Sequence, residues 1–433
     1  EWEQTETKNQ TFFLRRALNS PAFDSLAEMR RTQILTNLAN QLNTAGRFVE
    51  ALEYWTRALD IIPHFWMAQG NRGQAYISYG QALYDGGHQG AFLVSADDDL
   101  TSALASHALQ PALGSSQAYG HFKNIHDWLH SAIDVEAVRK SVELHDHPLG
   151  DTSDERTYRI WCLRHRLFLN PLNDLGPIAI AARDVFTLPN FSAPLDEPPV
   201  LIGLFNQMKQ EYVSARWLHY DAVNTGEPHF SDRGVLLHNT LDYPSYSLAV
   251  EKLKLSYRAA YSIFDKIAFF LNEYMRLGMK PKDVSFTKVW REKTDGPVRP
   301  EFETCENWPF RGLYWLSKDV VDKDFQGTTE PDARALQDIR NHLEHRYLKI
   351  HEFMIPPPPP SDTAFSLFTD TLAYSISRTD FETKGLRVLM LARAALIYLS
   401  LGMHREEQRR DAEKPEALIA PMQLDVWEDE WKV

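Results

Sequence analysis

Cysteine is nearly absent from this chain of 433 residues, which contains only Cys162 and Cys305. The two lie far apart and outside any ligand-like spacing, so the sequence predicts neither a disulfide framework nor a structural zinc centre and favours a reducing cytoplasm. Uncharged apolar runs of the ~18–20 residues that a membrane helix needs are lacking. The opening EWEQTETKNQ also lacks the basic-then-apolar pattern of a signal peptide. We therefore expect a soluble protein with no membrane partner.

Positive charge is also scarce, because 46 lysines and arginines face 59 acidic residues and leave a formal net charge of −13. This balance argues against binding nucleic acid over the whole surface and allows only a small basic site. The sequence has no glycine-rich phosphate loop, no His-Glu-x-x-His and no carboxylate pattern typical of a metal site. The string His145-Asp146-His147 favours a solvated loop over a metal site. No cofactor and no metal ion are predicted.

Helical periodicity is what the sequence has in abundance, and residues 37–63 closely resemble a tetratricopeptide (TPR) repeat. Before it, Ser20–Pro21 predicts a helix that runs to Asn43, because serine caps helices and proline suits their first position. Within the repeat, small residues allow close helix crossing, Gly46 permits the turn, Trp55 fills the gap, and proline ends the second helix. The small residues and the proline are Ala39, Ala51, Ala58 and Pro63.

A second repeat unit begins at Trp66 and loses the pattern at residues 84–90. The Ala103…Ala108 pair and residues 211–223 are interpreted as further, weaker helical hairpins. Residues 1–228 are therefore predicted to form a TPR-like α-solenoid, a class that usually binds a protein or peptide partner on its concave face.

The second half predicts a different architecture after a proline-rich crossing at residues 186–200 and a break at 229–246. Apolar stripes and breaker residues predict four helices, which suit an up-down bundle in residues 229–404. The charged tail 405–433 is predicted to be either disordered or a short docking segment. The fold class is thus all-α, and the predicted helices span residues 244–277, 310–323, 331–354 and 380–402.

An arginine followed five residues later by a histidine occurs three times, as Arg233–His238, Arg340–His345 and Arg346–His351. Only Arg340–His345 is expected in the middle of a long helix with further polar neighbours, Asn341 and Glu344. Spacing alone leaves a plain alternative open: Arg340 and Glu344, at i and i+4, form an ordinary surface ion pair, and His345 is an interface histidine.

Arg340-Asn341 followed by His345 resembles the active-site motif of the HEPN family (higher eukaryotes and prokaryotes nucleotide-binding). Four longer segments also resemble this family: AAYSIFDKIAFFLNEY (259–274), FRGLYWLSKD (310–319), IRNHLEHRYLKIHE (339–352) and LMLARAALIYLS (389–400). They are similar to a branch in which the HEPN domain follows a TPR-like region, as is YRIWCLRHRLFLNPLND (158–174). The resemblance implies a homodimeric, metal-independent endoribonuclease with RNA as substrate, and by analogy a toxin or anti-phage effector regulated through the repeats.

Residue chemistry is compatible with that role. Histidine titrates near neutral pH and can move the protons of a 2′-OH attack, while a guanidinium can stabilise the charged phosphorane. Asn341 is a candidate to orient His345 or hold a phosphate oxygen, and Glu344 to anchor Arg340 or its copy in the second subunit. Residues five apart on a helix differ by about 140° around its axis, so one subunit does not present Arg340 and His345 on the same face. A dimer axis along the helix is therefore expected to bring the two copies together and complete the site.

Two further hypotheses concern function outside cleavage. The first is a non-catalytic helical scaffold that uses the HEPN bundle only for dimerisation or nucleotide binding. The second rests on a resemblance to HEPN toxins in which a partner nucleotidyltransferase silences the enzyme by attaching AMP to a tyrosine placed like Tyr347, two residues after the histidine. A bulky, charged nucleotide there would block RNA and neutralise the arginine, whereas the simpler alternative is that Tyr347 packs at a dimer seam.

Overall fold

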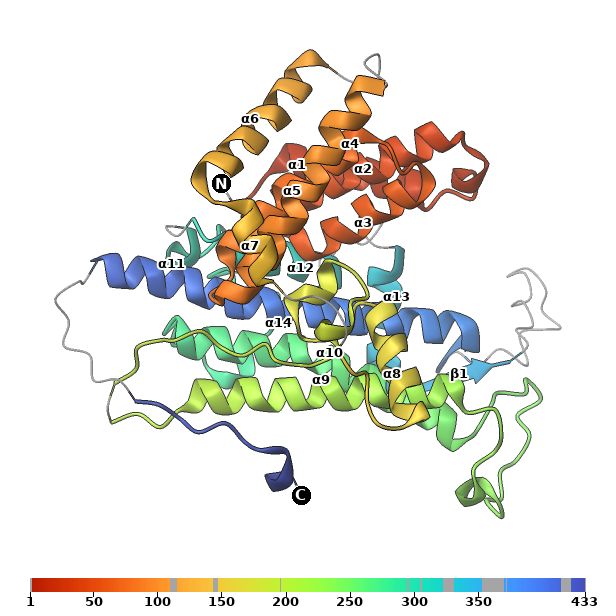
Figure 1. Ribbon diagram of the computed structural model, residues 1–433. Helices are drawn as coiled ribbons and strands as arrows, with labels where there is room; N and C mark the ends of the chain where they lie inside the picture. Colours follow the sequence, from red (N-terminus) through yellow and green to blue (C-terminus); the bar gives the residue numbers. More distant parts are fainter. Residues whose placement is uncertain are drawn as a thin grey trace.

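The computed structural model describes residues 2–109, 115–142, 147–194, 196–293, 296–303, 306–321, 331–352, 370, 372–413 and 422–432. It is predominantly helical (Figure 1), which confirms the all-α prediction. The strands among the described residues form one small parallel pair. Two predicted features lie outside the described residues: His145 and Asp146 of the predicted solvated loop, and the prolines at 356–360.

Helical pairs build the N-terminal region. Its helices are α1 (Thr5–Leu18), α2 (Glu28–Thr44), α3 (Phe48–Ile61), α4 (Trp66–Ala82), α5 (Gly86–Leu109), α6 (Ser116–Ala132) and α7 (Val135–Ser141). The α2–α3 pair is the predicted repeat, and Gly46 takes a φ of +93° in its turn. A Cβ on Gly46 would lie 2.3 Å from the Trp308 carbonyl oxygen, so glycine is required here both for the turn and for contact with the second half. Trp55 is buried and donates its indole hydrogen to Asn40 at 3.0 Å.

Three predictions in this region need correction. The helix expected over residues 20–43 begins only at Glu28, because the chain forms a short 3₁₀ turn at Phe23–Ser25 and is extended at Leu26. Residues 86–90, read as a loss of pattern, are the first turn of α5, which packs along α4. The segment 211–223 is no repeat hairpin but part of one long helix that packs against the second half.

The middle of the chain crosses between the two halves. It contains α8 (Ser153–Arg164), the 3₁₀ helices η2 (Pro171–Asp174) and η3 (Ala179–Ala181), and the predicted non-helical stretch before α9 (Val200–Asn224). This stretch runs along the last helix of the chain, where the Thr187 carbonyl accepts a hydrogen bond from Ser400 at 2.7 Å and the Ser192 amide donates to Glu407 at 2.9 Å.

The second half contains helices from the four predicted segments and one short unpredicted helix, with α9 as an additional layer along α10. The helices are α10 (Leu248–Tyr274), α11 (Pro300–Glu303), α12 (Trp308–Val321), α13 (Pro331–His345) and α14 (Arg378–Glu413). Ser247 caps α10 by accepting the Val250 amide hydrogen at 3.2 Å. Figure 1 shows α14 crossing between the N-terminal pairs on one side and α9 and α10 on the other.

The predicted third helix, 331–354, is wrong at its C-terminal end. The helix stops at His345, and Tyr347–His351 form strand β1, which pairs in parallel with β2 (Ala373–Ser377). The reason is a change in apolar spacing: Leu336, Ile339 and Leu343 follow helical steps, whereas Leu348 and Ile350 alternate. His345 therefore lies at the end of a helix and not in its middle.

The fourth predicted helix is too short, because α14 continues through residues 403–413. The start of the charged tail, which was expected to be either disordered or a short docking segment, is therefore helical. Glu407 holds this end by accepting the Tyr274 hydroxyl hydrogen at 2.7 Å. By length and composition α14 is the one described helix that could cross a membrane, yet 83% of its most apolar 18-residue window is buried inside the protein. It is the central helix of the fold.

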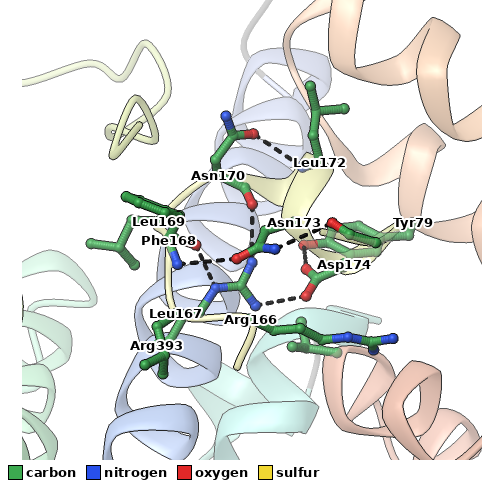
Figure 2. A network of polar contacts seen from close by, with 12 residues as sticks. Tyr79, Arg166, Leu167, Phe168, Leu169, Asn170, Leu172, Asn173, Asp174 and Arg393 are labelled. Carbon is green, nitrogen blue, oxygen red and sulfur yellow. Dashed lines mark hydrogen bonds and ion pairs between the residues drawn. The ribbon is translucent and has the colours of Figure 1, made fainter. Parts of the chain in front are cut away.

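Buried ion pairs join the two halves. Figure 2 shows Arg393 of α14 donating to Asp174 of η2 at 2.6 Å and to the Asn170 carbonyl at 3.0 Å, while Tyr79 of α4 donates to the same aspartate at 3.0 Å. Arg393 is 1% exposed, so its charge is satisfied wholly by the protein. The repeat region and the bundle therefore share one continuous core.

A second such junction centres on Asp319 of α12. Its carboxylate accepts from Arg15 of α1 at 3.0 Å and from Arg47 at the start of α3, and all three side chains are buried. Because α12 also packs against α13, the repeat region is connected through one helix to the candidate site.

Candidate active site

The predicted motif lies on the last turns of α13 and on the residues that follow it. His345 is exposed at the C-terminal end of the helix, and the Arg346 amide closes the last turn by donating to the His342 carbonyl at 3.1 Å. No hydrogen bond or ion pair holds the imidazole of His345 within the described residues, so both ring nitrogens are available to a substrate or a second subunit.

Arg340 is directed toward α10 and is only partly exposed. Its guanidinium lies 3.8 Å from the Asp265 carboxylate, 5.9 Å from the Tyr261 ring centroid and 3.4 Å from the Asn341 side-chain oxygen. The carboxylate and the aromatic face restrict the arginine from one side, and its side chain is 36% exposed on the other. Burial raises the pKa of Tyr261, so its hydroxyl is neutral beside the guanidinium.

Glu344 pairs with Arg258 of α10 at 3.7 Å, and Arg258 also donates to the Leu343 carbonyl at the end of α13. The simple i, i+4 pair between Arg340 and Glu344 is therefore not formed, because each of the two finds a partner on α10. These contacts position the end of α13 on α10, and the side chains from Glu344 to Tyr347 are exposed.

The structure places all four predicted residues on one turn and a half of helix, but it does not bring Arg340 to His345. Arg340 reaches Asn341 and α10, while His345, about 140° further around the helix axis, faces outward. One subunit thus presents the two chemical groups on different faces. Their catalytic roles stay predictions.

The strand after the helix carries the remaining candidate. Tyr347 is 43% exposed at the start of β1, with the Lys349 ammonium 5.5 Å from its ring centroid. Lys349 is itself buried and paired with Asp242 at 2.6 Å and Asp370 at 3.0 Å. Modification of this exposed tyrosine by AMP stays a prediction, which intact-mass measurement of protein from the native host would test.

The two other arginine–histidine pairs have different surroundings. Arg233 and His238 lie in the irregular segment between α9 and α10, and His351 is buried on β1. Sequence reasoning missed Arg258, Tyr261 and Asp265, which hold the end of α13. Successive spacings of three and four residues place them along one side of α10, but only the fold shows that this side faces α13.

The fold and the site together define the class of protein. It is an all-α protein in which helical pairs are fused to a helical bundle that carries an Arg-Asn…His motif at the end of one helix. Residues 192–406 match the LA2681-like HEPN family model. The chain therefore belongs to the HEPN-domain family through this region, and the match includes α9 as well as the four predicted helices. Comparison with curated proteins and with solved structures gave no match. A HEPN domain indicates a nucleotide-binding or RNase-type function.

Proposed function

We propose that this protein is a metal-independent endoribonuclease whose active site is shared between the two subunits of a homodimer. The observation that carries the proposal is the arrangement on α13: Arg340 is restrained by α10, while His345 is exposed at the helix end and has no hydrogen-bond partner in the described part of the chain. A group that binds phosphate benefits from being held in place, and a group that moves protons must reach the substrate.

The reaction is an attack of the RNA 2′-oxygen on the adjacent phosphorus. In each site, His345 of one subunit removes the 2′-proton and, once protonated, supplies a proton to the departing 5′-oxygen, while the second subunit contributes Arg340. The guanidinium of Arg340 donates to the phosphorane oxygens, where negative charge accumulates. The products are a 2′,3′-cyclic phosphate and a 5′-hydroxyl, and no water or metal ion is consumed.

A surface beside His345 supports dimerisation. The segment between α9 and α10 exposes seven large apolar side chains and joins β1 through a 2.7 Å hydrogen bond from the Ser245 amide to the Ile350 carbonyl. Figure 1 shows this segment and β1 at the same end of the molecule. Exposed apolar surface of this kind marks interaction sites. The residues are Phe230, Val235, Leu236, Leu237, Leu241, Tyr243 and Tyr246.

Dimers that carry two different substitutions test the shared site. Arg340→Ala and His345→Ala chains, given different tags and produced together, yield a mixed dimer that can be purified with both tags. We expect each pure variant to be inactive and the mixed dimer to regain about half of the wild-type cleavage rate, because one of its two symmetric sites is complete.

Each other result in that experiment has a definite meaning. Full activity in either pure variant would remove the catalytic assignment. A wild-type enzyme that cuts RNA as a monomer at micromolar concentration, or a mixed dimer as inactive as its parents, would show that the site is not shared in this way.

The repeat region offers a route for regulation. We propose that a protein or peptide partner acts through α12, because Arg15 and Arg47 of the repeat region share the buried Asp319 on that helix. An RNase-type enzyme whose activity is controlled through such a contact would suit a role as a toxin or antiviral effector. Unchanged cleavage when a native binding partner of the repeats is added would argue against this regulation.

A further inference from the structure

Two histidines and an aspartate outside the HEPN domain meet between α5 and α6. Asp97 on α5 and His126 and His130 on α6 each offer a ligand atom, and the three atoms all lie within 4.8 Å of one another. We propose that these residues form a Zn²⁺ site that links the two helices. The site does not depend on the proposed RNA cleavage.

The ligand set is built by the helices. His126 and His130 stand one turn apart on α6, so they project from the same face, and their ring centroids are 4.4 Å apart. The Asp97 oxygen lies 2.7 Å from Nε2 of His130 and 3.6 Å from Nε2 of His126. Zn–N and Zn–O bonds of about 2.0–2.2 Å require ligand atoms roughly 3.3 Å apart. Small side-chain rotations therefore suffice.

The carboxylate of Asp97 is buried and held in a fixed orientation. It is 7% exposed, and its second oxygen accepts a hydrogen bond from Arg139 of α7 at 3.0 Å. Arg139 thus fixes the carboxylate while leaving the other oxygen directed at the imidazoles. The carboxylate of Asp127 lies 3.7 Å from Nδ1 of His126. This is beyond hydrogen-bond distance, but it is on the side of the ring where outer carboxylates orient metal-binding histidines.

The surroundings favour a cation and leave room for its remaining ligand. Beside His130 lies an open cavity of about 400 Å³, bounded by the turn between α6 and α7, so water reaches this histidine. A site of three protein ligands would take water as its fourth ligand. The residues joined to the site by ion pairs, counted without the two histidines, carry a net formal charge of −2. They are Asp97, Asp98, Asp127 and Glu136 against Lys123 and Arg139.

Two imidazoles and a carboxylate suit Zn²⁺ better than Mg²⁺ or Ca²⁺, which prefer oxygen ligands alone. A bound ion would connect α6 to α5 at the end of the N-terminal region, far from α13 in Figure 1. Removing it with a chelator should therefore leave RNA cleavage unchanged. The metal proposal and the proposed function can therefore be tested, and can fail, independently of each other.

Calorimetric titration of metal-free, full-length protein with Zn²⁺ tests the site, with visible absorption of the Co²⁺-loaded protein as a second readout. We expect one ion per chain and a tetrahedral Co²⁺ spectrum. The His126→Ala/His130→Ala variant should lose at least about a hundredfold in affinity and the spectrum with it. His121→Ala, an exposed histidine earlier on α6, is the matched control and should bind as the wild type does. No binding by the wild type, or binding that survives the double substitution, would overturn the proposal.

Discussion

Replacing His345 by alanine is expected to lower the rate of RNA cleavage by at least about 10²-fold, the usual contribution of a general acid–base group. The stability of the variant should match that of the wild type, because the side chain is exposed and, within the described chain, makes no hydrogen bond. Cleavage of a labelled RNA by purified protein, together with thermal unfolding of the same samples, measures both quantities.

His342 provides the matched control on the same helix. Its Nδ1 lies 2.7 Å from the Asp338 carbonyl, and its ring packs against Tyr374 at 5.5 Å. It is therefore a structural histidine, and His342→Ala should retain cleavage within about threefold. If His345→Ala cuts RNA as fast as the wild type, or if both variants lose activity equally, His345 is not the acid–base group.

Replacing Asp174 by alanine is expected to cause the largest loss of stability, about 3–5 kcal/mol, as for other broken buried pairs. The carboxylate is fully buried and is the one charged partner of Arg393 among the described residues. Without it, a guanidinium that is 1% exposed keeps only carbonyl acceptors. The Tyr79 hydroxyl loses its acceptor as well. The midpoint of denaturant unfolding, followed by circular dichroism, reports the change.

Glu251→Ala is the control for this measurement, because Glu251 pairs with Lys254 on the surface of α10 with its side chain 56% exposed. Its unfolding midpoint should stay close to that of the wild type. Because the Asp174 network joins α4, η2 and α14, we also expect the repeat region and the HEPN domain to unfold in one transition. A small effect of Asp174→Ala, or two separate transitions in the wild type, would show that this junction does not couple them.

Local sequence was sufficient to predict the α2–α3 pair and the course of α10. The turn at Gly46 requires a positive φ, and the apolar stripe of α10 repeats at three and four residues, so each signal lies within a few residues of the element it specifies. The end of α13 was not predicted, because β1 depends on pairing with β2, more than twenty residues further along the chain.

The motif residues of the candidate site could be found from sequence, but their orientation could not. That Arg340 lies against Asp265 and not against Glu344 depends on the packing of α13 on α10. The residues of the proposed Zn²⁺ site were not singled out from the sequence for a similar reason. His126 and His130 have a ligand-like spacing, yet Asp97 is twenty-nine residues before His126 and joins them only through the α5–α6 contact.

The most direct test of the central claim is the chemistry of RNA ends produced in the presence of EDTA. Total RNA is incubated with purified wild-type protein or with the Arg340→Ala/His345→Ala variant, and the new ends are sequenced and their phosphates identified. The account predicts new 2′,3′-cyclic phosphate and 5′-hydroxyl ends with the wild type alone. No cleavage by the wild type would leave the HEPN domain as a scaffold for dimerisation or nucleotide binding. A strict requirement for Mg²⁺, or equal cleavage by the double variant, would contradict the proposed mechanism.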